Sequence, residues 1–512
     1  MNYYIGIDIG TTGAKALLVD ERGTVCAQAA SEYSFSTPKS LWCEQNPADW
    51  WNATRTVFRE LVDKTSKAGE SIKGIGLTGQ MHGLVLLDER GEVLRPCIMW
   101  NDQRTGSQCE NITEKIGYDR LLNLIANPVL PGFTLPKILW VRENEPDIYK
   151  KIVHIVLPKD YIRYKLTGEF ATDVSDASGM AVLDVAHRKW NDELLDELSV
   201  PREWLPKVYE SPEVTGVISN RASEQTGLQE GIPVVAGGGD QAAGAVGCGI
   251  VSPGIVSVTI GTSGVVFAHS DQMALQPEGK LHSFCHAVPG AWHLMGVTLA
   301  AGGSLRWYRD TFATQEIEQA RQSNIEVYDV LLKRVQKINA GADGVFFLPY
   351  LAGERTPYPD PGAQGVFFGL SLRHTRDHLL RAVMEGVGYS LRDCLELVKS
   401  VGVPITQIRL SGGGARSAVW RQIIADIFNE EVITLNTSDG APYGAALLAA
   451  VGTEKFSSVR EACDATIAIG ERHSPNPENT KRYEDGYTIY KELYPSLKKS
   501  FQQNTQLLTK YM

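Results

Sequence analysis

We predict an α/β protein with two duplicated domains that face each other across a cleft, and three features of the sequence support this prediction. The chain has 512 residues, which is more than one hydrophobic core organises, because domains usually run to about 100–200 residues. Strand-like apolar runs alternate with helix-like runs through both halves, as in α/β architectures. A strand, glycine turn and strand pattern occurs near the start and again at mid-chain, which indicates duplication.

The repeated pattern reads Y-I-G-I-D-I-G-T-T-G at 4–13 and V-S-V-T-I-G-T-S-G at 256–264, and an apolar strand follows each copy. Glycine lets the backbone turn tightly and approach a ligand closely, while threonine and serine supply donors. We therefore expect both turns to cup phosphates of a nucleotide. The residues concerned are Thr11, Thr12, Gly261, Thr262 and Ser263. Each turn taken alone also suits an ordinary glycine-rich hairpin.

Further elements follow from hydrophobic periodicity. Helices are expected at 47–67, 379–400 and 418–428, and strands at 72–77, 84–87 and 408–410. An aromatic stripe near the end of the chain has helical spacing, which is typical of a packing face, so we predict a closing helix there. The stripe consists of Tyr483, Tyr487, Tyr490, Tyr494 and Leu497. We place the first domain at 1–247 and the second at 248–512.

Composition and charge exclude several classes of protein. With 43% hydrophobic and 21% charged residues the chain is globular, and its net charge of -10 provides no basic surface for nucleic acid. The first residues read as a strand rather than a secretion signal, and no segment is apolar for long enough to span a membrane. We therefore expect a cytosolic protein. The eight cysteines lack paired or metal-ligand spacing and are expected to be reduced thiols, mostly buried.

A candidate catalytic base lies near the end of the first domain. Residues 233–244 read as a buried strand, a glycine turn and a small-residue helix whose first turn holds Asp240. Aspartate is a good helix N-cap, so a purely capping role is the alternative. A cap does not need the three preceding glycines, whereas a ligand beside the carboxylate needs the space they leave. Phosphoryl transfer tolerates a weak base, because the attacking hydroxyl needs mainly orientation.

Asp8 is a candidate metal ligand. It lies at the end of the first strand, directly before the first glycine turn. Magnesium prefers oxygen ligands and keeps several waters, so one or two carboxylates are enough. We expect Asp8 to face Mg²⁺ or the transferred phosphate. The alternative is that it satisfies N–H groups of its own turn.

Polar side chains follow two further strands, at the position where open α/β sheets bind ligands. The segments G-Q-M-H-G at 79–83 and W-N-D-Q-R at 100–104 offer amide, imidazole and guanidinium groups that suit sugar hydroxyls. His82 has no second histidine or cysteine at ligand spacing, which argues against a metal role. It could instead cap a neighbouring carbonyl.

Two glycine-containing loops lie in the second half. The segment S-G-G-G-A-R-S at 411–417 joins a strand to a helix, a common way to bring backbone against a nucleotide, and it contains Gly412, Gly413 and Gly414. The segment G-E-R-T-P at 353–357 suits either an ordered loop near the nucleotide or a salt-bridged turn.

Together these motifs resemble the FGGY family of carbohydrate kinases along almost the whole chain, and within it the members that phosphorylate D-xylulose. The motifs are 79–83, 100–104, L-P-K-D-Y at 157–161, G-G-G-D-x-A-A-G-A at 237–245, S-F-C-H-A at 283–287 and 353–357. The resemblance implies the actin-like ATPase (ribonuclease H-like) fold with a central cleft, and a homodimer. The segment L-A-A-G-G-S at 299–304 departs from the pattern and leaves the contacts of the nucleotide near Ala300–Ser304 open.

The resemblance also implies an activity, the ATP-dependent phosphorylation of D-xylulose to D-xylulose 5-phosphate with Mg²⁺ in pentose catabolism. It implies Asp240 as the base toward the terminal hydroxyl and Asp8 as the residue that faces the metal. The implied sugar site consists of Gln80, Met81, His82, Trp100, Asn101, Arg104, Asp240 and Gln241. The implied ATP site consists of Gly261 and Thr262 with the 412–414 loop.

Three other functions stay open at this point. A kinase for ribulose, an alditol or another small polyol would keep the same chemistry, and a substrate panel separates it. An actin-like ATPase that acts as a filament or chaperone-type switch could use the same fold, but the polar sugar-reading segments argue against it. A sugar-binding regulator without catalysis is disfavoured by the presence of Asp240 and both turns.

Overall fold

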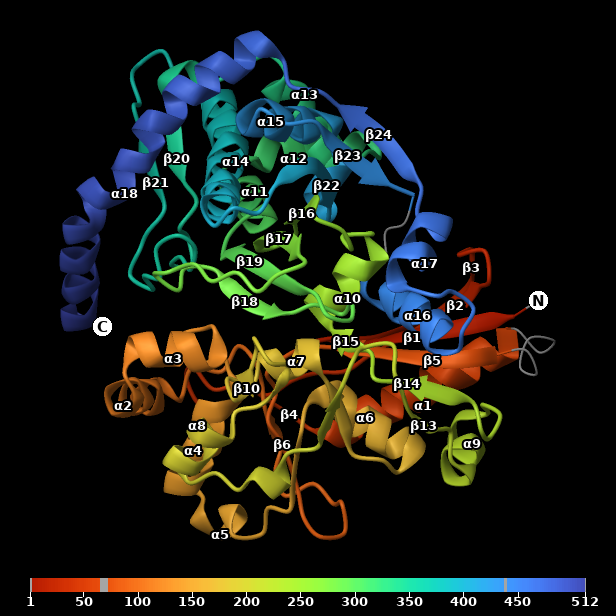
Figure 1. The fold of residues 1–512 in the computed structure, drawn as a ribbon. Coiled ribbons are helices and arrows are strands. Elements are labelled where there is room, and N and C mark those ends of the chain that lie inside the picture. The colour runs from red at the N-terminus through yellow and green to blue at the C-terminus, as the bar shows by residue number, and fades with distance from the viewer. Residues whose placement is uncertain (1, 65–71, 437–439, 512) are drawn as a thin grey trace.

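The computed structural model describes residues 2–64, 72–436 and 440–511 and shows two α/β domains, each organised around a seven-stranded sheet (Figure 1). In the first sheet the strand order is β13-β14-β5-β1-β2-β3, and β15 lies beside β5. These strands are β1 (Tyr3–Ile9), β2 (Gly13–Asp20), β3 (Val25–Glu32), β5 (Ile72–Gly79), β13 (Val214–Val217), β14 (Pro233–Val235) and β15 (Gly238–Gly239).

The second sheet repeats this arrangement, with the order β18-β19-β17-β16-β22-β23-β24. Its strands are β16 (Gly254–Ile260), β17 (Gly264–Ser270), β18 (His282–Cys285), β19 (Trp292–Thr298), β22 (Ile405–Ser411), β23 (Val432–Leu435) and β24 (Ile469–His473). Strand β16 is antiparallel to β17 and parallel to β22, as β1 is to β2 and β5. The duplication predicted from the repeated pattern is therefore confirmed in the topology.

Helices cover both faces of the first sheet. Helices α1 (Pro47–Lys64) and α6 (Pro158–Thr167) pack on one face, and α10 (Asp240–Gly247) and α16 (Gly440–Gly452) pack on the other (Figure 1). The strands between them carry fully buried apolar residues such as Ile5, Ile7 and Ile75. A strand buried on both faces reads as a nearly continuous apolar run, which is the pattern seen in the sequence.

The second sheet packs mainly against α14 (Arg376–Ser400), α15 (Ala418–Phe428) and α11 (Gly302–Phe312), with α12 (Thr314–Ser323) and α13 (Val327–Val335) beside them. Helix α18 (Pro477–Tyr511) runs along the outside of this domain, and its C-terminal end reaches down toward the first domain (Figure 1). Tyr483 and Tyr490 on α18 are buried, so the predicted packing face is confirmed.

A group of shorter elements enlarges the first domain in the lower part of Figure 1. It consists of α2 (Gly106–Ile116), α3 (Tyr118–Ile125), α4 (Thr134–Asn144), α5 (Pro146–Tyr149), α7 (Val174–Ser178) and α8 (Asp192–Leu198), with the short strands β4 (Glu44–Gln45), β6 (Val85–Leu87), β7 (Cys97–Ile98), β8 (His154–Val156), β9 (Ala171–Asp173), β10 (Leu183–Asp184), β11 (Lys189–Trp190) and β12 (Lys207–Tyr209). The core of this group includes Phe284 and Met295 from the second sheet, so the two domains also touch here.

The predicted elements occur with small shifts in their ends. Helix α14 begins at Arg376, three residues before the predicted start, and the last three residues of the predicted helix 47–67 lie outside the described part of the chain. All eight cysteines are free thiols, and six of them are buried, as expected. Within the described residues, no helix combines the length and the apolar character needed to cross a membrane.

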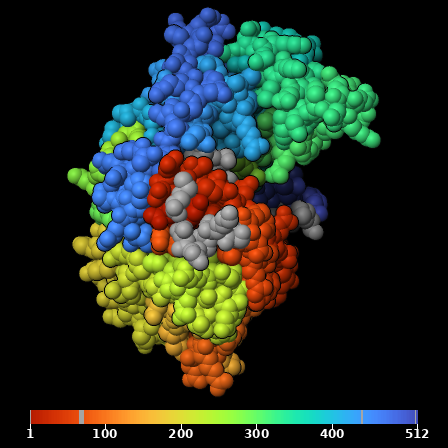
Figure 2. Space-filling model, turned by 90° about the vertical axis from the view of Figure 1, so that its right-hand side faces the viewer, coloured from red at the N-terminus to blue at the C-terminus, as the bar shows by residue number. Residues whose placement is uncertain are grey.

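The two domains are joined through α16, which belongs to the second half of the sequence but lies on the first sheet and against α10. Figure 2 shows blue residues of the last third of the chain directly beside the red N-terminal strands. Gly6 and Gly76 make this approach possible, because an added Cβ would lie only 1.8 Å from the carbonyl oxygens of Pro442 and Ala445, respectively. Tyr4, Val246 and other buried residues complete the core between the domains.

We expect the substitution Gly6→Ala to destabilise the protein by about 1–3 kcal/mol, the usual cost of overpacking, because the new methyl group meets backbone that cannot rotate away. Gly106→Ala is the matched control, because Gly106 begins α2 and nothing lies within 4 Å of an added Cβ. Thermal unfolding of both variants checks this expectation. Equal melting temperatures for the two variants would contradict the proposed close contact.

Candidate functional site

The register of the first sheet brings Asp8 and Asp240 to the same edge. Asp8 pairs with Thr78 of β5, and Thr78 pairs with Gly238 of β15. Asp240 begins α10 directly after β15. Because β1, β5 and β15 run parallel, their carboxyl ends lie side by side, at the edge where open α/β sheets bind ligands. The two predicted carboxylates therefore belong to one site.

Burial shifts the protonation of both carboxylates. It raises the pKa of Asp240 to about 6, although hydrogen bonds from Gln241 oppose the shift. It raises the pKa of Asp8 to about 7, and the neighbouring charge of Asp240 adds to this increase. The N-cap of α10 is Gly239, and Asp240 Oδ1 accepts only the N–H of Gln241 at 2.8 Å. The capping alternative for Asp240 is therefore wrong.

Asp8 also fits a metal ligand by its contacts. Its Oδ1 atom is buried and has no hydrogen-bond partner among the described residues. A buried carboxylate oxygen without a donor is costly unless a cation or a ligand satisfies it. Because Oδ1 accepts no N–H of its own turn, it does not support the alternative in which Asp8 only stabilises that turn.

The two predicted phosphate turns have similar exposure and different backbone bonds. Thr12 and Thr262 are exposed at the tips of the β1–β2 and β16–β17 turns. The first turn is closed by a bond from the Gly10 N–H to Gly13 O, and the second by a bond from the Gly261 N–H to Ser263 O, each of 3.0 Å. The second turn is thus one residue tighter than the first.

The 299–304 segment lies directly against the second turn. The N–H groups of Gly302 and Gly303, at the start of α11, donate to Gly261 O at 2.7 Å and to Thr262 O at 3.0 Å. These donors are therefore occupied by the turn itself. The segment that departs from the family pattern supports the turn in this structure.

Gln80 lies beneath the first turn, with 3% of its surface exposed. Its Nε2 atom donates to Gly10 O at 3.3 Å and to Gln45 Oε1 at 2.9 Å. The amide that we expected to contact sugar hydroxyls thus holds the turn from below. Its predicted contact with a substrate stays a prediction.

Trp100 and Asn101 lie near the same turn. Trp100 is 40% exposed, and its Nε1 donates to Thr11 Oγ1 at 3.1 Å. The Oδ1 atom of Asn101 is buried and has no hydrogen-bond partner among the residues that the structure describes. Both side chains keep the capacity to meet a ligand.

Arg104 differs from expectation. Its side chain is 1% exposed, donates to Asp102 and Glu44, and stacks over the Trp42 ring at 3.7 Å. The guanidinium is therefore part of a buried ion network that supports the 100–104 loop. A direct contact with the sugar would require this network to open.

Met81 contacts the turn that carries Asp240, and His82 contacts Gly179 at the end of α7. An added Cβ at Gly239 would lie 2.9 Å from Met81 Sδ, and one at Gly179 would lie 2.4 Å from His82 Nδ1. Burial lowers the pKa of His82 to about 3, so the ring is neutral. Gly179 O lies 2.7 Å from Nδ1 and can only accept, so Nδ1 carries the proton and Nε2 is free to accept a hydroxyl.

Lys137 is a site residue that sequence reasoning missed. It is fully buried on α4, and its ammonium donates to His82 O at 2.9 Å and to Gly132 O at 2.7 Å. His82 has a left-handed backbone (φ 68°), which is unfavourable for a residue with a side chain. The lysine helps to hold it there. A lone lysine in the apolar run 133–141 was the available signal.

A second buried network holds the turn before Asp240. Lys159, from the L-P-K-D-Y motif, pairs with Asp173 at 2.9 Å. Asp173 accepts a hydrogen bond from Ser175 Oγ, which in turn accepts from the Gly239 N–H at 3.1 Å. The motif therefore supports the backbone beside Asp240 from behind the site.

A cavity of about 570 Å³ opens beside Asp240. Its lining includes Asp240 and Gln241 from α10, Thr259 from β16, and Gly412 and Gly413 from the loop after β22. Gly414 instead packs against Ile260. The structure thus brings the predicted base and two of the three predicted loop glycines around one space, while the two turns lie outside it.

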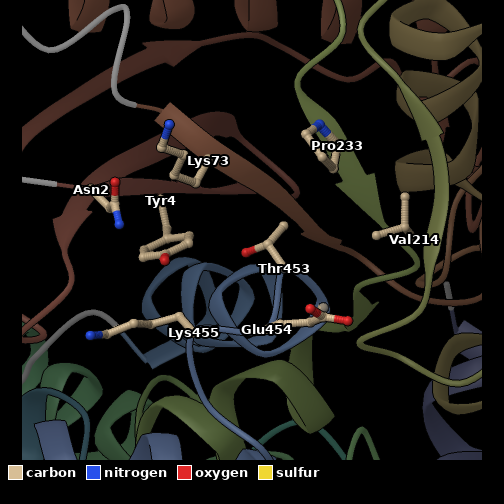
Figure 3. Close-up of a pocket in the computed structure, with 9 residues that line it drawn as sticks. Asn2, Tyr4, Lys73, Val214, Pro233, Thr453, Glu454 and Lys455 are labelled. Carbon is tan, nitrogen blue, oxygen red and sulfur yellow. The ribbon is translucent and has the colours of Figure 1, made fainter.

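Another pocket lies at the opposite edge of the first sheet, where β1 and β5 begin. Figure 3 shows it between these strands and the end of α16, with Tyr4, Lys73 and Thr453 among the residues that line it. Because Tyr4 and Asp8 stand at opposite ends of β1, this pocket is separate from the carboxylate site.

Known proteins were compared with the chain. The family model for the FGGY family of carbohydrate kinases, N-terminal domain, matches residues 3–247, and the C-terminal domain model matches residues 256–453. Xylulose kinase from Bacillus subtilis is 40% identical over 510 residues, which is 98% of this chain and 100% of that protein. Xylulose kinase from Escherichia coli is 41% identical over 495 residues, covering 96% and 99%.

A solved structure of xylulose kinase from Rhodospirillum rubrum has a TM-score of 0.90 at 33% identity and covers 98% of this chain and 100% of that chain. The match extends over both sheets and the cleft between them, so the actin-like ATPase fold is confirmed. With both domain models matched and identities of about 40% over nearly the full length, the chain belongs to the FGGY family of carbohydrate kinases.

Proposed function

We propose that this carbohydrate kinase transfers the terminal phosphoryl group of ATP to the C5 hydroxyl of D-xylulose, giving D-xylulose 5-phosphate. The relatives named xylulose kinase support this acceptor. The observation that carries the proposal is the pairing of Asp8 and Asp240 at one sheet edge, beside a cavity that reaches the 412–413 loop.

Asp240 is the proposed base. Its carboxylate stands at the start of α10 and lines the cavity of about 570 Å³, where a hydroxyl can approach it. The hydroxyl oxygen attacks the terminal phosphorus of ATP in line with the leaving oxygen, and its proton passes to Asp240 as the bond forms. Because the transition state is loose, orientation of the hydroxyl contributes more than basicity.

Asp8 is the residue that would hold Mg²⁺, and its unpartnered buried oxygen fits this role. The cation would supply charge neutralisation at the phosphates. Gly412 and Gly413 are proposed to approach the nucleotide with their backbone, together with the turns at 11–12 and 261–263. Closure of the cleft would keep water from accepting the phosphate.

The proposed sugar site runs from Asp240 and Gln241 past Met81 to His82. The neutral His82 ring offers Nε2 as an acceptor, and Trp100 and Asn101 offer further polar atoms. Gln80 and Arg104 are assigned to the support of this site rather than to direct contact. Lys137 and Lys159 hold the backbone of His82 and of the Asp240 turn.

Three further expectations stay proposals. We place the boundary between the domains after residue 247, at the end of α10. We also expect a homodimer and a cytosolic location. None of these affects the chemistry at Asp240.

We expect Asp240→Asn to lower kcat for D-xylulose by about 100- to 10,000-fold, the range for loss of a general base. The amide keeps the size of the side chain but cannot take the proton. The measurement is ADP release, coupled to a dehydrogenase, over a panel of ketoses and polyols. Asp119→Asn, an exposed substitution on α3, is the matched control and should leave kcat unchanged.

Each result of this assay has a distinct meaning. Turnover with another ketose but none with D-xylulose would leave the base in place and overturn the acceptor. Full activity of Asp240→Asn would overturn the base.

We expect kcat/KM for D-xylulose to fall with decreasing pH, about tenfold per unit below pH 6. The base works only in its ionised form, and burial raises the pKa of Asp240 to about 6, so protonation removes activity below that value. A pH series from 5 to 8 at saturating Mg-ATP checks this. A flat profile over that range would contradict the assignment of Asp240.

A further inference from the structure

The loop at 353–357 places an unusual arginine near the proposed sugar site. The loop lies between β20 (Phe346–Leu348) and β21 (Val366–Phe368) of the second domain. Thr356 Oγ1 donates to Lys280 O at 3.2 Å, so the loop lies directly beside the start of β18, which carries His282. The His282 ring in turn lies 5.8 Å from that of Phe133, a neighbour of His82 on the first domain. The charge of Arg355 lowers the pKa of both histidines, which agrees with this placement. Sequence reasoning left this loop between two interpretations.

The residues on either side of Arg355 are fixed to the second sheet. Glu354 accepts hydrogen bonds from Thr298 Oγ1 at 2.7 Å and from the Leu299 N–H at 3.1 Å. The Thr356 N–H donates to Val297 O at 3.0 Å, and Thr356 Oγ1 accepts from the Val297 N–H at 3.2 Å. The loop is therefore rigidly attached at the end of β19.

The interpretation of this loop as a salt-bridged turn is wrong. Glu354 Oε1 accepts from the backbone N–H groups of Arg355 and Leu299, at 2.7 Å and 3.1 Å, and Oε2 accepts from Thr298 Oγ1. The guanidinium of Arg355 has no hydrogen bond and no ion pair with any residue in the described ranges 2–64, 72–436 and 440–511. Arg355 is half-buried; burial lowers the pKa of its guanidinium, and the charge of Glu354 opposes this shift.

A half-buried guanidinium without a protein acceptor keeps its N–H groups available to a ligand, which can replace water as their partner. Aromatic rings from both domains lie between the loop and the proposed sugar site. The His82 ring centroid lies 4.8 Å from that of Phe133, and the buried His282 ring stacks on Phe284 with 5.6 Å between centroids. These rings offer no carboxylate, so on this side the guanidinium is open to a molecule that enters the cleft.

The position of Arg355 relative to the base indicates which end of the acceptor it meets. Met81 packs on the turn that carries Asp240, and His82 is the next residue. On its other side the His82 ring is followed by the rings of Phe133 and His282 toward the 353–357 loop, with 4.8 Å and 5.8 Å between successive centroids. Arg355 therefore stands beyond His82, away from the hydroxyl that is phosphorylated.

We propose that Arg355 binds the carbonyl end of the ketose, opposite the phosphorylated hydroxyl, and that it makes the enzyme prefer a ketose over the matching alditol. This inference rests on the proposed function. A carbonyl oxygen and its neighbouring hydroxyl present two acceptors side by side, which matches the planar fork of a guanidinium. An alditol lacks the carbonyl and leaves one donor unmet, which is a strong basis for discrimination.

The test compares D-xylulose with xylitol in the wild type, in Arg355→Met and in Arg355→Lys. We expect Arg355→Met to raise KM for D-xylulose by about 10- to 100-fold, as for the loss of a charged hydrogen bond, with kcat changed less than about threefold. The preference in kcat/KM for D-xylulose over xylitol should fall by about tenfold. Arg355→Lys should recover part of the affinity and little of the preference, because an ammonium lacks the fork.

Arg321→Met is the matched control, because its side chain is 84% exposed on α12, away from the cleft. It should leave KM and the preference unchanged. Circular dichroism and thermal unfolding of Arg355→Met show whether the variant is folded, and Arg355→Lys carries the comparison if it is not.

Three results would overturn the proposal: an unchanged KM in a folded Arg355→Met variant, an equal loss for ketose and alditol, or a fall in kcat alone. The last would place Arg355 at the transferred phosphate. A wild type that is inactive on D-xylulose would instead overturn the proposed acceptor, and the comparison would then use the active ketose and its alditol. If no ketose is active, both proposals fail.

Discussion

The close packing of α16 on the first sheet is the contact on which the rest of the structure depends. Two strand positions without side chains let the helix backbone lie directly on β1 and β5, so a segment from the second half becomes part of the core of the first domain. Helix α10, which carries Asp240, packs closely against α16. Backbone contact sets the spacing between α16 and the first sheet. Because close-packed regions move as rigid units, the cleft opens and closes around this junction.

Burial is the common physical cause of the electrostatics in the site. It raises the pKa values of Asp8 and Asp240 and lowers that of His82. A carboxyl group with a pKa near 6 ionises readily at neutral pH yet binds a proton more strongly than an exposed aspartate does. A neutral imidazole with one nitrogen already donating is a fixed acceptor. The site thus has defined donors and acceptors before a ligand enters.

Much of the fold could be predicted from the sequence, because the strands and helices that define it are long and strongly periodic. The repeated glycine turn predicted the duplication, and the run around Asp240 predicted its place at the start of a helix. The supporting roles of Lys137 and Ser175 were out of reach, since Lys137 bonds to His82 and Ser175 to Gly239, which are far away in the chain. At Gln80 and Arg104 the motif could not reveal that each polar side chain also bonds to the protein, and their predicted substrate contacts stay predictions. Residue type indicates which chemistry a side chain can perform, and only the tertiary contacts decide which way it points.

The origin of α16 has a consequence for the order in which the protein can form. During synthesis, the strands of the first sheet leave the ribosome long before residues 440–452 exist. Domains generally fold as units from the N-terminus. One apolar face of that sheet, with its glycine backbone, nevertheless stays uncovered until nearly nine-tenths of the chain has been made. The sequence of the first domain is finished at mid-chain, but its structure is finished only when α16 has been made. In the interval the nascent protein exposes a large apolar surface to which a chaperone would bind.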